Sequence, residues 1–451
     1  MRKKWQQQMP LMNAENDHPQ AQELETISRI IRSKPTICDL VLQDLRKHRP
    51  TTAKSGANGM SADQVLRAAI VKILFGFTYV DLAFHMVDSR TLRRFCHIGI
   101  ADKGFKKSVL NKNIKAISDG TWQAINKELV GYAKESNIEK GRQVRIDCTV
   151  VESNIHEPSD SVLLWDAVRV LTRLLHCAKQ SLGPGQLHFQ DHTRRAKRRM
   201  VAVQYAKSKK ARLSPYKDLL KVSSKTLGYA RSAIDLLSQS PSASLSRMCL
   251  ALDLKEYAGL TTKVIDQTER RVLRDEKVPA TEKVLSLFEP HTDVIVKDRR
   301  DTFYGHKVCL TGGASNLILD CVILEGNPAD TSLTETMLDR QNDLYGRYPL
   351  KAALDGGFAS KDNLAIAKSK HIKDVCFAKK RGLKESDMCR SPYVYKRLRR
   401  FRAGIEAGIS WLKRSFGFNR CTWKGWQSFK SYVWATIVSA NFLTIARKQL
   451  A

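Results

Sequence analysis

Three carboxylates stand in settings that suggest chemistry. Asp147 lies inside "QVRIDCTVVESN", a predicted strand, where carboxylates are disfavoured. Asp355 ends a second predicted strand, "LKAALD", directly before Gly356 and Gly357, which would let a metal ion or a phosphate approach the backbone. Glu406 is the single acid in the basic helix predicted for "RFRAGIEAGISWLKR". Carboxylates with such settings are candidates for metal binding.

Phosphoryl transfer explains why these residue types would gather. Mg²⁺ takes oxygen ligands, commonly carboxylates together with substrate phosphates. Two such ions about 4 Å apart stabilise both the attacking and the leaving oxygen of an in-line displacement. Arg402 and Lys413 share a helical face with Glu406 and could hold a DNA strand by its phosphates. We expect Gly404, Ala407 and Gly408 to let this helix lie close to the sheet or to neighbouring helices.

Each acid also has an ordinary structural explanation. Asp147 could be a polar residue at the end of a strand, and Asp355 with Gly356 could form a hairpin turn. Glu406 could pair with Arg402 on the helix surface, which would be worth about 0.3–0.5 kcal/mol. The combination of all three on a basic chain is more specific than any single member.

The elements that carry these acids predict an α/β core. Alternating apolar residues predict a strand over 144–152. Helical periodicity without a convincing strand follows to about residue 290. Further strand-like runs are "TDVIVK", "GHKVCLTGG", "NLILDCVILEG", "LKAALDGGF" and "IKDVCFAK", with a helix predicted before "LKAALDGGF". The expected domains are therefore a core at 141–165 and 291–451, split by a helical insertion at 166–290.

An all-helical domain is expected at residues 1–140. Ser61 and Gln64 form a capping-box pattern that opens a helix with apolar residues at a period near 3.6. Several short helices with basic faces follow. A helix-turn-helix DNA-binding domain fits this pattern, and so does any small helical bundle.

The charge of the chain favours a polyanionic partner. Among 451 residues there are 77 Lys and Arg against 45 Asp and Glu, which gives a net charge of +32. Nucleic acid is the first candidate for such a surplus. An anionic membrane surface is the other, but no basic helix has a broad apolar face. The late apolar run between Lys430 and Arg447 is shorter than the roughly 18 residues of a membrane span, so we expect a core helix.

Cysteine usage indicates a reducing compartment. The ten cysteines include no C-x-x-C pair, so neither a zinc ribbon nor a dithiol motif is supported. The start of the chain, Met1 to Lys4, shows no secretory leader. We therefore expect a cytoplasmic protein with free thiols.

The predicted insertion is strongly basic in its first half. Few acids balance its cations. A run of like charges can be simply a solvated surface. Phosphate contact is the favoured explanation. The candidate DNA-binding residues of this segment are Arg194, Arg195, Arg198 and Arg199.

Taken together, these motifs resemble those of the DDE transposases of bacterial insertion sequences, and in particular the ISNCY group. "RIDCTVVESNIHEPSDSVLL" is similar to the segment that carries the first Asp, "ALDGGF" to the second, and "RAGIEAGISWLKR" to the Glu helix. "FYGHKVCLTGG" with "EGNPADTSLTETMLDR" is similar to the central strands. The resemblance extends from about residue 61 to 445.

The resemblance implies an RNase H-like core in which Asp147, Asp355 and Glu406 form the catalytic, metal-binding triad. The implied cofactor is Mg²⁺, as two ions, with Mn²⁺ as a substitute. A family signature of Tyr, Arg, Glu and Lys on one helix matches at Arg402, Glu406 and Lys413.

That signature is broken at its first position. Arg399 stands where the family has Tyr, although Tyr395 lies one turn earlier. One expected contact with the DNA strand therefore has no obvious residue.

The activity implied is that of a transposase, which cleaves the ends of an insertion sequence and joins the freed 3′-OH to target DNA. The expected partners are double-stranded DNA and a second copy of the chain or a larger assembly, near the bacterial nucleoid. Lys307 is a weaker candidate for phosphate contact. Two alternatives remain open: an RNase H-like nuclease without strand transfer, and a non-catalytic DNA-binding protein derived from a transposase.

Overall fold

A computed structural model describes residues 17–47, 59–99, 101–239, 244–297 and 301–451. The first 16 residues of the expected helical domain, on which the expectation about a secretory leader rested, lie outside this range. Among the described residues, no single helix is long and apolar enough to cross a membrane. One pair, α3 (Ala62–Leu74) and α4 (Tyr79–Asp88), meets the length and composition test only when joined across a bend of 110°.

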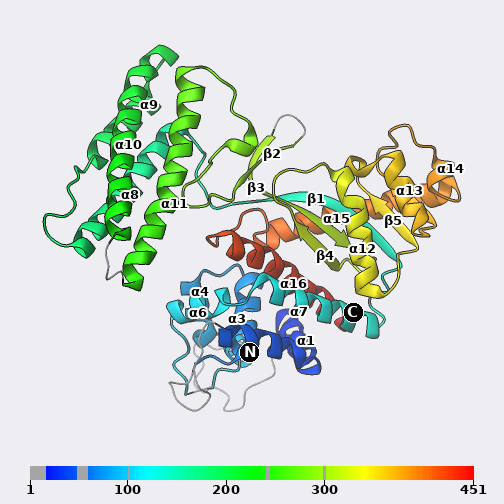
Figure 1. Cartoon of the computed structure of the whole chain (residues 1–451). Helices are drawn as coiled ribbons and strands as arrows, with labels where there is room; N and C mark the ends of the chain where they lie inside the picture. The colour runs from blue at the N-terminus through cyan, green and yellow to red at the C-terminus, as the bar shows by residue number, and fades with distance from the viewer. Residues whose placement is uncertain (1–16, 48–58, 100, 240–243, 298–300) are drawn as a thin grey trace, which may run out of the picture.

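A mixed sheet of six strands forms the centre of the molecule (Figure 1). Its order is β2-β3-β1-β5-β6, and β4 pairs with β3. β1 and β4 are antiparallel to β3, whereas β5 is parallel to both β1 and β6. The strands are β1 (Gln143–Glu152), β2 (Asp293–Lys297), β3 (Asp301–Gly312), β4 (Ile318–Ile323), β5 (Lys351–Leu354) and β6 (Asp374–Phe377). The predicted mixed α/β class is confirmed, and the sheet is consistent with an RNase H-like core.

Helices from the second half of the chain cover this sheet. α15 packs against β1, β5 and β6, and α16 contacts β4. α13, which connects the parallel strands β5 and β6, was not predicted from the sequence. The helices are α12 (Thr334–Tyr345), α13 (Lys361–Ser369), α14 (Glu385–Met388), α15 (Pro392–Phe416) and α16 (Trp426–Leu450).

The segment between β1 and β2 forms a helical lobe of its own, drawn in green in Figure 1. It consists of α8 (Asp160–Leu182), α9 (Thr193–Tyr205), α10 (Lys209–Ser238) and α11 (Leu245–Thr268), followed by short turns. Two apolar clusters formed by these helices are separate from the main core. The boundary expected between residues 165 and 166 falls inside α8, which is one continuous helix capped by Ser159.

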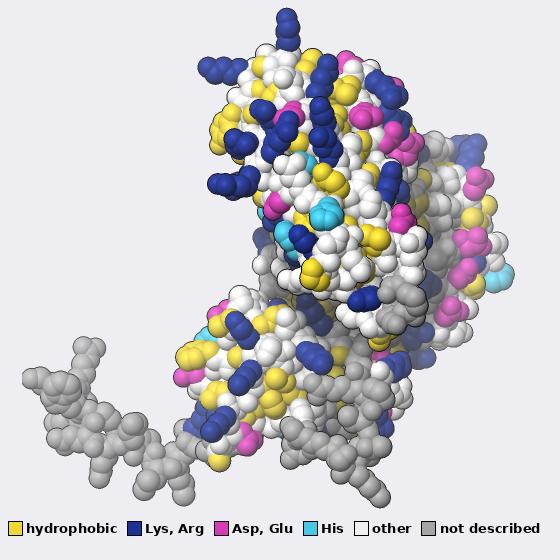
Figure 2. Space-filling view, turned by 60° about the vertical axis from the view of Figure 1, so that its left-hand side comes forward, with side chains coloured by type: hydrophobic (Ala, Val, Ile, Leu, Met, Phe, Trp, Pro, Cys, Tyr) yellow, Lys and Arg dark blue, Asp and Glu magenta, His cyan; other side chains and the backbone are white. Residues whose placement is uncertain are grey.

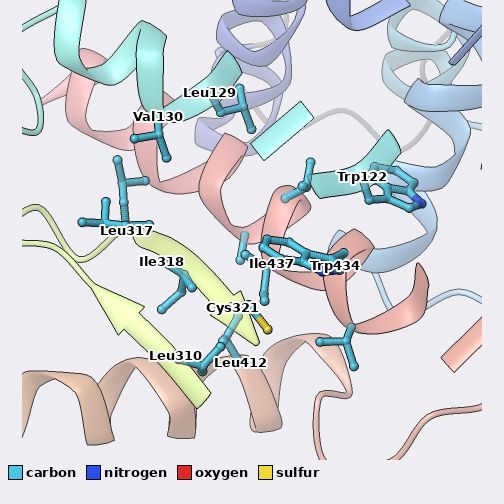
Figure 3. Packing of buried hydrophobic residues seen from close by; sticks show 14 of the residues in the cluster. Trp122, Leu129, Val130, Leu310, Leu317, Ile318, Cys321, Leu412, Trp434 and Ile437 are labelled. Carbon is cyan, nitrogen blue, oxygen red and sulfur yellow. The ribbon is translucent and has the colours of Figure 1, made fainter. Parts of the chain in front are cut away.

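The N-terminal helices share the core of the sheet instead of packing only on one another. Figure 3 shows Trp122 and Leu129 of α7 in the same apolar cluster as Ile318 of β4 and Ile437 of α16. The helices are α1 (Pro19–Ser33), α2 (Thr36–Lys47), α3 (Ala62–Leu74), α4 (Tyr79–Asp88), α5 (Arg90–Phe95), α6 (Lys107–Lys115) and α7 (Asp119–Glu135).

A buried polar network joins these layers. Asn441 of α16 accepts a hydrogen bond from the backbone N–H of Ile318 at 3.0 Å and donates to its carbonyl at 2.8 Å. It also donates to the side-chain oxygen of Asn126 at 2.8 Å, and Asn126 donates to the carbonyl of Leu319. The late apolar run is thus a core helix, and its Asn441 binds a strand that would otherwise expose unpaired backbone groups.

Candidate active site

Asp147 and Asp355 lie on adjacent strands. Ile146 in β1 is in register with Leu354 in β5, so the two acids that follow these residues are neighbours. The backbone N–H of Asp355 donates to the carbonyl of Ile146 at 3.3 Å. The hairpin-turn alternative for Asp355 is wrong, because β5 lies between two parallel strands. Asp355 instead caps a short 3-10 turn with its side chain.

The packing of α15 on the sheet determines where Glu406 lies. Arg145, two residues before Asp147 on β1, donates to the carbonyl of Phe401 at 3.1 Å. Its guanidinium lies against Gly404, where a Cβ would be 2.8 Å from the Arg145 Cζ. Sequence analysis did not single out Arg145. The only local signal was its position at i−2, which puts it on the same face of the strand as Asp147.

Arg402 contacts all three acids of the predicted triad. Its Nη2 lies 2.6 Å from an oxygen of Glu406. Its Nη1 lies 3.1 Å from Asp355 and 3.7 Å from Asp147. The Arg402 side chain is 13 % exposed, against 57 % for Glu406. The pair is therefore more than a helix surface interaction, since the arginine joins residues from β1, from the end of β5 and from α15.

The two aspartates divide their oxygens in the same way. One oxygen of Asp147 accepts from the backbone N–H of Cys148 at 2.7 Å, and one of Asp355 accepts from that of Gly357 at 3.4 Å. The other oxygen of each is the one close to Arg402. Each aspartate therefore offers one oxygen to the centre of the cluster.

The electrostatics of the cluster keep Arg402 charged. Burial lowers the pKa of its guanidinium, but the hydrogen bond and charge of Glu406, together with Asp355 and Asp147, outweigh this and raise it. Opposite charges within a few ångströms favour the charged form of a group. The centre of the triad is thus occupied by a permanent cation.

The donor set suits a hard divalent cation. Carboxylate oxygens are the ligands that Mg²⁺ prefers, and here three carboxylates converge on one positive group. Within the described ranges, however, no three or more His, Cys, Asp or Glu side chains are arranged to hold a metal ion. The residue types therefore suit a divalent cation, whereas their side chains are positioned to contact the guanidinium of Arg402.

Other predicted site residues on the core have different surroundings. Lys413 is half-buried two turns beyond Glu406 on α15. Tyr395 cannot replace the missing tyrosine at a DNA strand, because it is 2 % exposed and its hydroxyl donates to the carbonyl of Phe377. Lys307 binds Asp330 at 2.5 Å and the carbonyl of Pro328, so its ammonium anchors a neighbouring loop.

The arginines predicted for DNA contact lie on α9. The insertion that contains α9 forms the upper part of Figure 2, where many Lys and Arg side chains are exposed. They form two stripes at i and i+4 spacing. Arg195 and Arg199 both bind Asp218 of α10, each at 2.5 Å. Arg194 and Arg198 are exposed on the neighbouring stripe, with no ion-pair partner within the described part of the chain.

The N-terminal helices give mixed support for DNA binding. α3 and α4 meet at 110° across a turn that contains Gly76, as in a helix-turn-helix unit. However, α4 contains no Lys or Arg, and its exposed large side chains are Val80 and Phe84. This face of α4 is poorly suited to phosphate contact.

Comparison with protein families finds one match, in the second half of the chain. Residues 265–442 match the model of the transposase DDE domain. This segment of the chain is therefore similar to the DDE domain of transposases. The match includes Asp355, Arg402, Glu406 and Lys413. It begins within α11, near the end of the insertion, so Asp147 lies outside it. Comparisons with curated proteins and with solved structures gave no match.

Proposed function

We propose that the protein is a DNA transposase of an insertion sequence, similar to the ISNCY group, that cleaves the element ends and joins the 3′-OH to target DNA. The observation that carries this proposal is the convergence of Asp147, Asp355 and Glu406, from two adjacent strands and a helix, around one cation. Two of these acids, Asp355 and Glu406, lie in the segment that matches the transposase DDE domain, which supports the proposal.

In this proposal, Asp147, Asp355 and Glu406 hold two Mg²⁺ ions, with Mn²⁺ as a substitute. When bound, such ions stabilise the attacking and leaving oxygens of phosphoryl transfer. The role of the chain is to position the strand. Arg402 and Lys413 on α15 would bind phosphates beside the scissile bond, and arginine suits a phosphate because it can donate two parallel hydrogen bonds.

We further propose that the insertion holds duplex DNA through α9. The exposed stripe of Arg194 and Arg198 is its best-supported contact, because these two side chains are not engaged by Asp218. A transposase must bring two element ends together, so the active form would be a dimer or a larger assembly on DNA.

A two-end assay tests the proposal. The purified protein is incubated with DNA that carries the inverted repeats flanking its gene, a target plasmid and Mg²⁺. Nicked ends together with joined products are expected from the wild type, and neither from Asp355→Asn, which should still bind the DNA. Cleavage without joined products would favour the nuclease alternative. DNA binding without cleavage in the wild type would favour the non-catalytic one.

A further inference from the structure

Arg402 lies at the centre of the triad formed by Asp147, Asp355 and Glu406. Its side chain is 13 % exposed, so the guanidinium lies between protein groups and not in solvent. Among the described residues, it is the one positive group in contact with all three acids.

The oxygens that Arg402 contacts are those that a metal would need. The second oxygen of Asp147 and of Asp355 is already bound to the backbone. Mg²⁺ binds oxygen ligands at about 2.0–2.1 Å and demands near-octahedral geometry. A guanidinium 3.1 Å from Asp355 and 2.6 Å from Glu406 fills that space. The two cations therefore cannot share the cluster.

We propose that Arg402 is an internal counter-ion that closes the triad, and that a divalent cation binds Asp147, Asp355 and Glu406 only when the guanidinium leaves. This inference rests on the proposed function, because it assumes that the three acids are metal ligands. It assigns Arg402 a second role besides contact with the DNA strand: it regulates access to the metal site.

The hydrogen-bonding capacity of Arg402 is incompletely satisfied. Its Nε is buried and has no hydrogen-bond partner among the described residues. Leaving a buried donor unpaired is unfavourable. A phosphate of a DNA strand is a better acceptor for a guanidinium, because it can accept two parallel hydrogen bonds. Arg402 would thus leave the acids most readily when DNA is present, and DNA binding and metal binding would strengthen each other.

Calorimetric titration of the full chain with Mn²⁺, without DNA, tests the inference. The variants are Arg402→Ala and Arg402→Gln, and the matched control is Arg400→Ala, which removes an exposed charge from the same helix. We expect the two Arg402 variants to bind Mn²⁺ about fivefold more tightly than the wild type, or better, as is typical of coupled sites. The control should stay near the wild type, because an exposed charge is screened.

A titration of Asp147→Asn and Asp355→Asn separates this inference from the proposed function. If these variants lose Mn²⁺ binding but the Arg402 variants bind like the wild type, the metal site stands and the counter-ion role is overturned. An equal gain in Arg400→Ala would also overturn it, by showing a general charge effect. If the aspartate variants bind Mn²⁺ normally, the proposed metal site itself is wrong. Circular dichroism confirms folding, and Arg402→Gln carries the test if Arg402→Ala unfolds.

Discussion

The guanidinium of Arg145 lies directly against the backbone of Gly404, so that the strand bearing Asp147 fixes the helix bearing Glu406. Arg145 also donates to the carbonyl of Phe401 and to the side-chain oxygen of Asn316. No side chain larger than hydrogen fits at residue 404 without moving this arginine. This buried contact therefore helps to set the distance between the first and last acids of the triad, together with the packing of α15 on β1, β5 and β6.

Replacement of Gly404 by Ala should destabilise the protein and slow DNA cleavage. The new Cβ would displace the Arg145 guanidinium and break its hydrogen bonds, at a cost of about 1–3 kcal/mol. Gly408→Ala is the matched control, because a Cβ there meets nothing within 4 Å. It should stabilise α15 by about 0.5–1 kcal/mol, since alanine is the better helix former. Thermal unfolding and cleavage rates of both variants measure these effects.

A double-mutant cycle shows whether Arg145 is the cause. In an Arg145→Ala background, the guanidinium is absent and Gly404→Ala should no longer be destabilising. Additive losses would mean that residue 404 is constrained by something other than Arg145.

Local sequence patterns identified the candidate acids because each acid lies beside a recognisable signal. A period of two marked β1, a Gly-Gly pair marked the end of β5, and a basic helix marked Glu406. The sequence could not predict that Arg402 lies among the acids, because that depends on how α15 crosses the sheet. The expectation that Gly404, Ala407 and Gly408 all allow close packing was right only for Gly404: residue 407 is exposed, and Gly408 has space around it.

For the fold, too, local elements could be predicted from the sequence, but their packing on one another could not. The strands after residue 291 were found because they are apolar and separated by turn residues. α1 and α2 were not singled out, although Leu24, Ile27, Ile30 and Ile31 recur in α1 at a helical period. The joining of the N-terminal helices to the sheet was also missed. It depends on a shared apolar core and on the pairing of Asn126 with Asn441, residues that lie far apart in the chain.

The two arginine stripes of α9 should contribute differently to DNA binding. Arg194→Gln with Arg198→Gln should reduce the slope of log affinity against log salt by about 2, roughly one unit for each lost phosphate contact. Arg195→Gln with Arg199→Gln is the matched pair. It should change the slope less and lower the thermal stability of the insertion, because these residues bind Asp218. Fluorescence anisotropy over a range of salt concentrations gives both slopes. Unchanged slopes in both would show that α9 is only a solvated surface.

The hydrogen bonds of Asn441 should contribute strongly to the stability of the protein. Asn441→Ala leaves the backbone N–H and carbonyl of Ile318 buried without partners, at a cost of roughly 2–4 kcal/mol in the free energy of unfolding. Ser439→Ala is the control on the same helix. The hydroxyl of Ser439 is buried without a hydrogen-bond partner in the described structure, so its removal should be neutral or stabilising. Urea titration measures both, and equal losses would contradict this account.

Replacement of Glu406 by Gln tests the triad at nearly constant shape. The amide oxygen can still accept from Arg402, and Glu406 is 57 % exposed, so stability should change by no more than about 0.5 kcal/mol. Cleavage with Mg²⁺ should fall by roughly 100-fold or more, because a neutral amide is a poor ligand for a hard cation and several kcal/mol of transition-state stabilisation are lost. Thermal unfolding and a cleavage time course on the same preparation separate the two effects.

The matched control is Glu385→Gln, which removes a carboxylate from another surface pair, with Lys380 at 2.6 Å, outside the triad. It should lose a similarly small amount of stability and keep full activity. If Glu406→Gln behaves like this control, Glu406 is a structural partner of Arg402. If Glu406→Gln instead keeps its melting temperature, binds DNA and does not cleave it, the carboxylate charge serves catalysis. In that case the only acid of the basic helix is there for the chemistry, and its ion pair with Arg402 is not the reason for its presence.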